Sequence, residues 1–244
     1  MLHYFSESAA MDKTERFRES YRQTQIGPGY QGWAHFAFTT GVCSLIIAGC
    51  LWRLQDVSVW EWLTVPITLV FANLVEHFGH RKAMHHRVRG LGLLFERHAG
   101  QHHRFFQPGR MAYDSSRDFK AVLFPPVLIV FFFGAFALPV GLLIAAFGSA
   151  NVGYLFVASA IGYFLNYELL HFAWHMREDS WVFRVPGMRA LRRVHHTHHH
   201  PELMSHYNFN VTYPLADWLH GTYHPGPDRR PADPAPKVHG EPGR

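Results

Sequence analysis

Long apolar runs alternate with polar, histidine-rich stretches along this chain. Four apolar segments stand out, at about 33–52, 59–78, 121–148 and 152–174. A membrane-spanning helix needs about 20 predominantly apolar residues, so each segment is long enough to cross a bilayer. The third carries Pro125, Pro126 and Pro139 and is too short to cross twice. We therefore expect one kinked or tilted crossing there, with a re-entrant hairpin as the alternative.

The links between the segments predict how they are arranged. Residues 53–58 and 149–151 are short connections, so the four segments are expected to form two helical hairpins. Of the 23 Lys and Arg residues, 22 lie in 1–32, 79–120 and 175–244. By the positive-inside rule, both termini and the 79–120 loop are expected on the cytoplasmic side. The location is then the inner membrane of a bacterium or the endoplasmic reticulum of a eukaryote.

Composition and charge narrow the classes of partner. The chain is 48% hydrophobic and 17% charged, with a formal net charge of +5. The basic residues lie on the expected cytoplasmic face, where they suit anionic lipid headgroups. No nucleic-acid-binding motif accompanies them, so no nucleic-acid partner is expected. Cys43 and Cys50 lie in an apolar run and provide no disulfide framework.

We expect three parts along the chain. Residues 1–32 form a cytoplasmic N-terminal segment, in which 8–24 resembles a surface helix. Residues 33–222 form the membrane domain. The tail, 223–244, is rich in Pro, Gly and charge and is expected to be disordered.

Four histidine clusters follow or flank the apolar segments. Neutral imidazole is the commonest protein ligand for transition metals. Helices starting at Val59 and Asn151 would each reach their first histidine after about 30 Å, one hydrocarbon thickness. All four clusters should therefore meet at one membrane surface, and ten imidazoles are about right for two ions. The expected ligands are His80, His85, His98, His102, His103, His171, His175, His196, His199 and His200.

Helical spacing leaves part of this set ambiguous. His171 and His175 are four apart and share a face. His80 and His85 are five apart, so the helix unwinds there or the two serve different metals. In the second cluster His98 and His102 share a face and His103 turns away, unless a local bulge absorbs one residue. The last cluster fits an HxxHH pattern in two registers: His196, His199 and His200, or His195, His198 and His199.

Carboxylates near the clusters are candidates to support the ligands. Glu76 lies four residues before His80, and Glu168 lies three before His171. A metal-bound histidine usually donates its second N–H to such a partner. Glu168 would also be costly near a span without a role.

The motifs resemble those of the fatty acid hydroxylase/sterol desaturase superfamily, integral-membrane di-iron enzymes, over about 60–222. The chain shows an HR..MH pair at His80, a histidine triple at His98, an HxxxH pair at His171 and a final HHxxHH. The superfamily's ending is matched at Asp217-Trp218 and Gly221-Thr222, although Ala216 and His220 replace its usual Trp and Phe. The resemblance favours the His196 register and places Asp217 at an acidic position that orients a ligand.

What the resemblance implies is an all-α membrane protein with four transmembrane helices and a cytoplasmic helical cap that carries the dimetal site. Its expected activity is hydroxylation, or desaturation, of a C–H bond in a fatty acyl, sterol or isoprenoid lipid, using O2. Two Fe ions are the expected cofactor, and zinc can replace them in purified protein. No flavin or dinucleotide motif is present, so electrons must come from a separate ferredoxin, cytochrome b5 or reductase.

Two other classes of function compete with the oxygenase. A metal-ion transporter needs polar ligands near mid-membrane, where only His35 lies well inside a span. A zinc-dependent membrane hydrolase usually mixes carboxylates with histidine. The histidine-only clusters outside the spans therefore favour the oxygenase.

Overall fold

The computed structural model describes residues 2–226, with side chains from residue 13 onward, and this part is helical without a β-strand. The long helices are α1 (Leu2–Thr24), α2 (Gly32–Trp52), α3 (Thr64–Gly79), α9 (Ala150–Trp174) and α10 (Met188–His198). The third apolar segment forms α7 (Pro126–Phe131), η5 (Phe132–Ala137) and α8 (Leu138–Phe147). The tail prediction for 223–244 falls mostly on 227–244, outside the described residues.

Short elements connect the long ones, and all of them except η1 lie toward the histidine-rich end of the bundle. They are η1 (Glu61–Leu63), η2 (His80–Met84), α4 (Gly92–Phe95), η3 (Glu96–His102), α5 (His103–Phe105), η4 (Ser116–Asp118), α6 (Phe119–Val122), η6 (Trp181–Arg184) and α11 (Leu215–Leu219). Of these, η2 and η3 are π-helical, as is η5. The remaining η elements are 3₁₀ helices.

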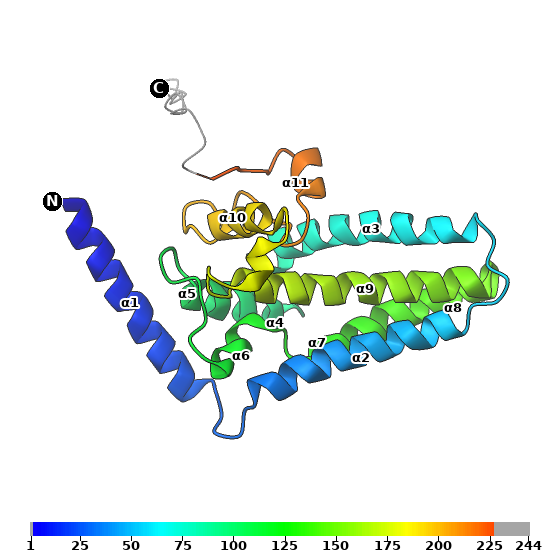
Figure 1. The fold of residues 1–244 in the computed structure, drawn as a ribbon, viewed down its shortest axis with the longest axis horizontal. Coiled ribbons are helices and arrows are strands. Elements are labelled where there is room, and N and C mark those ends of the chain that lie inside the picture. The colour runs from blue at the N-terminus through cyan, green and yellow to red at the C-terminus, as the bar shows by residue number, and fades with distance from the viewer. Residues whose placement is uncertain (1, 227–244) are drawn as a thin grey trace, which may run out of the picture.

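Helix α9 is the centre of the bundle. It packs against α2, α3 and α8, which run alongside it in Figure 1. The outer helices expose large apolar side chains, among them Leu45 on α2, Ile67 on α3 and Leu142 on α8. Such apolar outer faces are what a helix presents to lipid, where the backbone satisfies its own hydrogen bonds.

Three helical stretches are long and apolar enough to cross a membrane: 32–52, 126–147 and 150–174. The third apolar segment forms one helical run rather than a re-entrant hairpin. Its π-helical turn lies just before Pro139, whose ring would clash with the carbonyl of Ala135 in a regular α-helix. The segment 59–78 is divided between η1 and the 16 residues of α3, so a fourth span stays a prediction.

The N-terminal helix is docked onto the histidine-rich end of the bundle. The Arg18 side chain is fully buried, donates to the carbonyl of Ala112 and pairs with Asp114 at 2.9 Å. Arg22 pairs with Asp118 at 2.8 Å. The expected surface helix over 8–24 thus forms within α1, and ion pairs hold its C-terminal half in place.

Candidate metal centre

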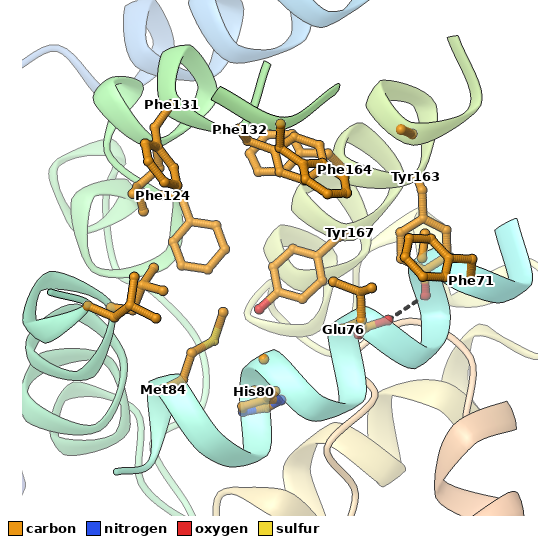
Figure 2. Close-up of a pocket in the computed structure, with 18 of the residues that line it drawn as sticks. Phe71, Glu76, His80, Met84, Phe124, Phe131, Phe132, Tyr163, Phe164 and Tyr167 are labelled. Atoms are coloured by element: carbon orange, nitrogen blue, oxygen red, sulfur yellow. Dashed lines mark hydrogen bonds between the residues drawn. The ribbon is translucent and has the colours of Figure 1, made fainter. Parts of the chain in front are cut away.

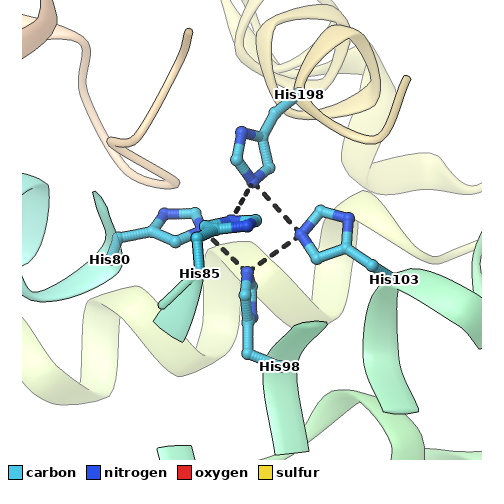
Figure 3. A group of neighbouring side chains, drawn as sticks. All are labelled: His80, His85, His98, His103 and His198. Carbon is cyan, nitrogen blue, oxygen red and sulfur yellow. Dashed lines mark hydrogen bonds between the residues drawn. The ribbon is translucent and has the colours of Figure 1, made fainter. Parts of the chain in front are cut away.

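Five imidazoles from three separate segments converge on one point. His80 and His85 come from η2 and the residue after it, His98 and His103 from η3 and α5, and His198 from α10. Their Nε2 atoms form a closed ring, with neighbouring atoms 2.7–3.2 Å apart (Figure 3). All five side chains are buried. We call this group site A.

A second group adjoins the first. His102, His175, His195 and His199 bring their ring nitrogens within 4.8 Å of one another. The Nε2 of His171 lies 3.1 Å from that of His102, so it sits at the edge of this group. The rings of His103 and His199 are only 4.3 Å apart between centroids, so the two groups share a wall. We call the second group, including His171, site B.

The π-helical segments explain the five-residue spacings. In a π-helix each N–H bonds to the carbonyl five residues earlier, so side chains five apart lie one above the other. This puts His80 with His85, and His98 with His103, in the same site. The expected unwinding and bulge are therefore present. Because the second cluster contains this bulge, His98 shares site A with His103, and His102, which would share a face with His98 in a regular helix, faces site B.

On helix α10, the histidines that face the two sites follow the His195 register. The resemblance favours the His196 register. His195, His198 and His199 point into the two sites. His196 lies on a different side of the helix, with its Nε2 2.9 Å from the carbonyl of Trp174. The His200 side chain is 31% exposed and faces Glu202. Neither His196 nor His200 belongs to a group, because the face that α10 packs inward is set by Val194 and Thr197, which are buried beside the three histidines.

Backbone carbonyls determine which ring nitrogen faces inward. The Nδ1 atoms of His102, His175, His198 and His199 lie 2.8–2.9 Å from the carbonyls of Ala121, Met111, Tyr207 and Phe106. The Nδ1 of His80 bonds likewise to Phe209. A carbonyl only accepts, so each Nδ1 carries the proton, and a neutral imidazole then has a bare lone pair on Nε2.

Nε2 lone pairs that face one another are the feature of the two sites that fits a bound cation. His102 and His199 both donate through Nδ1, yet their Nε2 atoms lie 3.1 Å apart. No hydrogen stands between two such acceptors, so the pair repels unless a positive ion lies between them. Metal–nitrogen bonds are about 2.0–2.1 Å, so two ligands at right angles around one ion lie about 3 Å apart. The observed spacings match that value.

Burial keeps these rings neutral. Desolvation, with a smaller contribution from neighbouring histidines, lowers the pKa of His85 to about 2. Burial also lowers the pKa of His198 to about 4. The pKa values of His98, His103 and His199 lie well below 6.5 for the same main reason. A metal must displace protons from its ligands, so low pKa values favour metal binding at neutral pH.

The predicted carboxylates do not touch the histidines of either site. Glu76 accepts hydrogen bonds from the backbone N–H groups of Val211 and Thr212. Asp217 accepts from those of Phe209 and Asn210. Both carboxylates therefore hold the 209–212 loop, whose Phe209 carbonyl in turn receives the Nδ1–H of His80. Asp217 is thus linked to His80 through the backbone of Phe209, and Glu76 supports the same loop.

Glu168 has a different environment. It is buried, and one oxygen accepts the N–H of Phe124 at 3.1 Å. The other oxygen has no hydrogen-bond partner among the described residues. It lies on the helix that carries His171 but bonds to no histidine there.

Sequence reasoning missed several residues that shape the centre. His77 is fully buried and lies 2.9 Å from the hydroxyl of Thr222, which donates to Asp217. Asn210 donates to the carbonyl of Asn73 and ties the loop to α3. His77 precedes His80 by one helical turn, and that spacing was the available signal. The backbone carbonyls that receive the Nδ1 protons leave no signal in the sequence.

An apolar cavity of about 460 Å³ leads to site A. It lies between α3, the α7–η5 run and α9, and α4 covers one end (Figure 2). Phe71, Phe131 and Phe164 line its walls, and His80 lies at the end where η2 begins. The lip residues Val127 and Phe131 are each 58% exposed, so the cavity opens sideways between α3 and α7.

Comparisons with known proteins found no match to this chain. No protein-family model matches it, and neither curated proteins nor solved structures give a significant match.

Proposed function

We propose that this protein is a membrane-bound di-iron oxygenase that hydroxylates, or desaturates, a C–H bond of a lipid. The observation that carries the proposal is the combination of two adjoining all-histidine groups with an apolar cavity that ends at His80. The donors that converge are imidazoles, which suit iron with open coordination positions. The proposal agrees with the motif resemblance to the fatty acid hydroxylase/sterol desaturase superfamily.

The proposed reaction balances with external electrons. Hydroxylation consumes the lipid C–H bond, one O2, two electrons and two protons, and yields the lipid alcohol and one water. Desaturation consumes the same reactants, removes two hydrogen atoms from adjacent carbons and yields two waters. The two iron ions would supply the O2 chemistry that no side chain supplies. A ferredoxin, cytochrome b5 or reductase would supply the electrons.

The protein's own residues have three tasks in this proposal. The imidazoles of site A and site B hold the ions, and Nδ1–carbonyl hydrogen bonds of five of them, among them His80, His102 and His199, keep those Nε2 atoms aimed inward. The loop that Glu76 and Asp217 anchor keeps His80 in place. The aromatic cavity excludes water and holds an alkyl chain against the wall that contains His80.

Metal analysis and lipid mass spectrometry test the proposal together. Purified protein should contain two metal ions per chain, counted as iron plus zinc because zinc can replace iron. Cells that express the protein should accumulate a lipid with one added oxygen, or two fewer hydrogens, only when O2 is present. A matched strain expressing His199→Ala should not.

The alternatives give different results in the same experiment. Zinc-containing protein that releases a lipid fragment without O2 would identify a hydrolase. Metal uptake into vesicles without any lipid change would identify a transporter. Either result would overturn the oxygenase.

A further inference from the structure

The hydroxyl of Tyr167, on the cavity wall near site A, has no hydrogen-bond partner among the described residues. Tyr167 lines the cavity from α9 and is 5% exposed. Its hydroxyl is buried and pairs with no described residue. Figure 2 shows this hydroxyl directed toward the space between Phe124 and Met84. Burying an unpaired hydroxyl is unfavourable, and native proteins rarely leave one without a reason.

At the end of the cavity that His80 lines, the other polar side chains already have partners. The Tyr163 hydroxyl donates to Glu76 and pairs with Thr212 at 2.7 Å. Glu76 is occupied by the 209–212 loop, and His80 by its Nδ1 bond and site A. Among the described residues at this end of the cavity, Tyr167 is therefore the one whose hydroxyl is free to bond to a ligand, whereas Thr68 lies at the opposite end.

The packing around the Tyr167 ring holds the hydroxyl in place. The ring stacks on Phe124 with 5.6 Å between centroids and 8° between planes. It also lies 5.6 Å from the ring of His171, at the edge of site B. A group bound to the hydroxyl would consequently lie beside both sites.

Charge limits what the bound group can be. Among the described residues that line the cavity, none is lysine or arginine, and Glu76 is acidic. A carboxylate or phosphate brought into this cavity would be desolvated without a cation to pair with, which costs much more than burying a neutral group. A hydroxyl, amide or carbonyl needs only the one hydrogen bond that Tyr167 can provide.

The direction of the cavity sets which part of a lipid reaches the site. It runs along α3 from Thr68 to His80, a distance of about 18 Å at 1.5 Å per residue. The Thr68 end lies within the bundle, and the Tyr167 end lies near the C-terminal end of the spanning helix α9. A lipid entering sideways keeps its chain in the bundle half and its polar end toward Tyr167.

We propose that the cavity takes an uncharged long-chain lipid whose hydroxyl, amide or carbonyl is held by the Tyr167 hydroxyl, so that oxidation falls close to this polar end. The part of this inference that concerns oxidation rests on the function proposed above. The part that concerns binding does not. Tyr167 is in this view a substrate-positioning and specificity-determining residue.

Lipid binding in nanodiscs tests the inference without turnover. Radiolabelled hexadecanol, hexadecane and palmitate are added to protein as purified, without reductant, and the lipid retained per chain is measured. The wild type should retain hexadecanol more tightly than hexadecane or palmitate. Tyr167→Phe should weaken hexadecanol binding about tenfold, because one hydrogen bond is lost and the lipid hydroxyl is left unpaired. The same variant should leave hexadecane binding unchanged.

The controls separate this role from a structural one. Tyr154→Phe makes the same change on the same helix outside the cavity and should bind all three lipids as the wild type does. Tyr167→Phe should keep the full metal count, since the lost hydroxyl bonds to no described residue. Unchanged hexadecanol binding in Tyr167→Phe, or palmitate binding as tight as hexadecanol, would overturn the inference.

A turnover measurement separates the two proposals. With reductant and O2, the oxidised carbon should lie near the hydroxyl of hexadecanol, and Tyr167→Phe should spread oxidation along the chain. Selective binding with no O2-dependent product would support the lipid site and reject the oxygenase. Oxidation at the methyl end of the chain would overturn the predicted orientation.

Discussion

At the residue scale, five of the candidate ligands are held at two points. Their Nε2 atoms face a site, and in His80, His102, His175, His198 and His199 the Nδ1 bonds to a backbone carbonyl. This arrangement leaves such an imidazole almost no freedom to rotate. His196 is oriented the opposite way: its ring is bonded through Nε2 to the Trp174 carbonyl and lies outside both groups.

The register of the last cluster can be tested by single substitutions. His198→Ala should lower the metal content by about one ion per chain, because it opens the site A ring. His200→Ala should keep both ions, since that side chain is partly exposed and lies outside both groups. Elemental analysis of folded protein measures both. Loss of metal in His200→Ala with retention in His198→Ala would restore the other register.

Acid should destabilise the metal-free protein. The folded-state pKa of His198 is about 4 and that of His85 about 2, both below the ordinary 6.5. Below about pH 6.5 the unfolded chain therefore binds more protons than the folded chain, and stability falls as pH falls, by up to about 1.4 kcal/mol per pH unit per histidine. The thermal midpoint of chelator-treated protein should therefore drop as pH falls from about 6.5 to about 4. His198→Gln should show a shallower drop, and a midpoint that rises in acid would contradict the argument.

At the element scale, the π-helical segments decide which histidines meet. The five-residue spacing of His80 and His85 predicts an irregular helix, and the structure has one. The sequence could not show which way the second cluster divides, because that depends on where the extra residue is absorbed. With the π-helix spanning Glu96–His102, the side chain that turns to site B is His102. The sequence also could not show which register α10 uses, because both registers satisfy the same HxxHH spacing.

Removing the extra residue should preserve the sites. Deleting Gly100 would let η3 become a regular α-helix in which the histidines corresponding to His98 and His103 are four apart and again share a face. The deletion variant should therefore keep two ions per chain. Insertion of one alanine after Gly100 moves the pair six apart and should lower the metal content. If the deletion loses metal and the insertion does not, the π-helical explanation is wrong.

At the scale of the whole molecule, the sequence predicts an all-helical bundle whose histidine clusters gather at one end, and the structure agrees. The clusters are predictable because histidine-rich motifs are visible in the sequence. The candidate spans are predictable because long apolar runs are visible there too. The carbonyls of Phe106, Met111 and Ala121 were not predictable, since every residue has one and only the fold selects those that face a histidine. The fourth span is still a prediction, because α3 is short.

Reporter fusions test the topology. A reporter after residue 244 should read cytoplasmic, and one inserted at 149–151 should read the opposite side, since the basic residues favour the cytoplasm. A second insertion within 53–58 should also read the opposite side if 59–78 spans. A cytoplasmic reading at 53–58 together with an opposite reading at 149–151 would reject the two-hairpin arrangement.

The sideways mouth of the cavity between α3 and α7 has a kinetic consequence. Under the proposed function, a lipid substrate that enters there would arrive by diffusion within the leaflet and not as a solute in water. The quantity that sets the rate is then the mole fraction of substrate among the surrounding lipids rather than its amount per volume of solution. Diluting the bilayer with an inert phospholipid should slow the proposed lipid oxidation at constant total substrate, and diluting the same vesicles with buffer should leave the rate per protein chain unchanged.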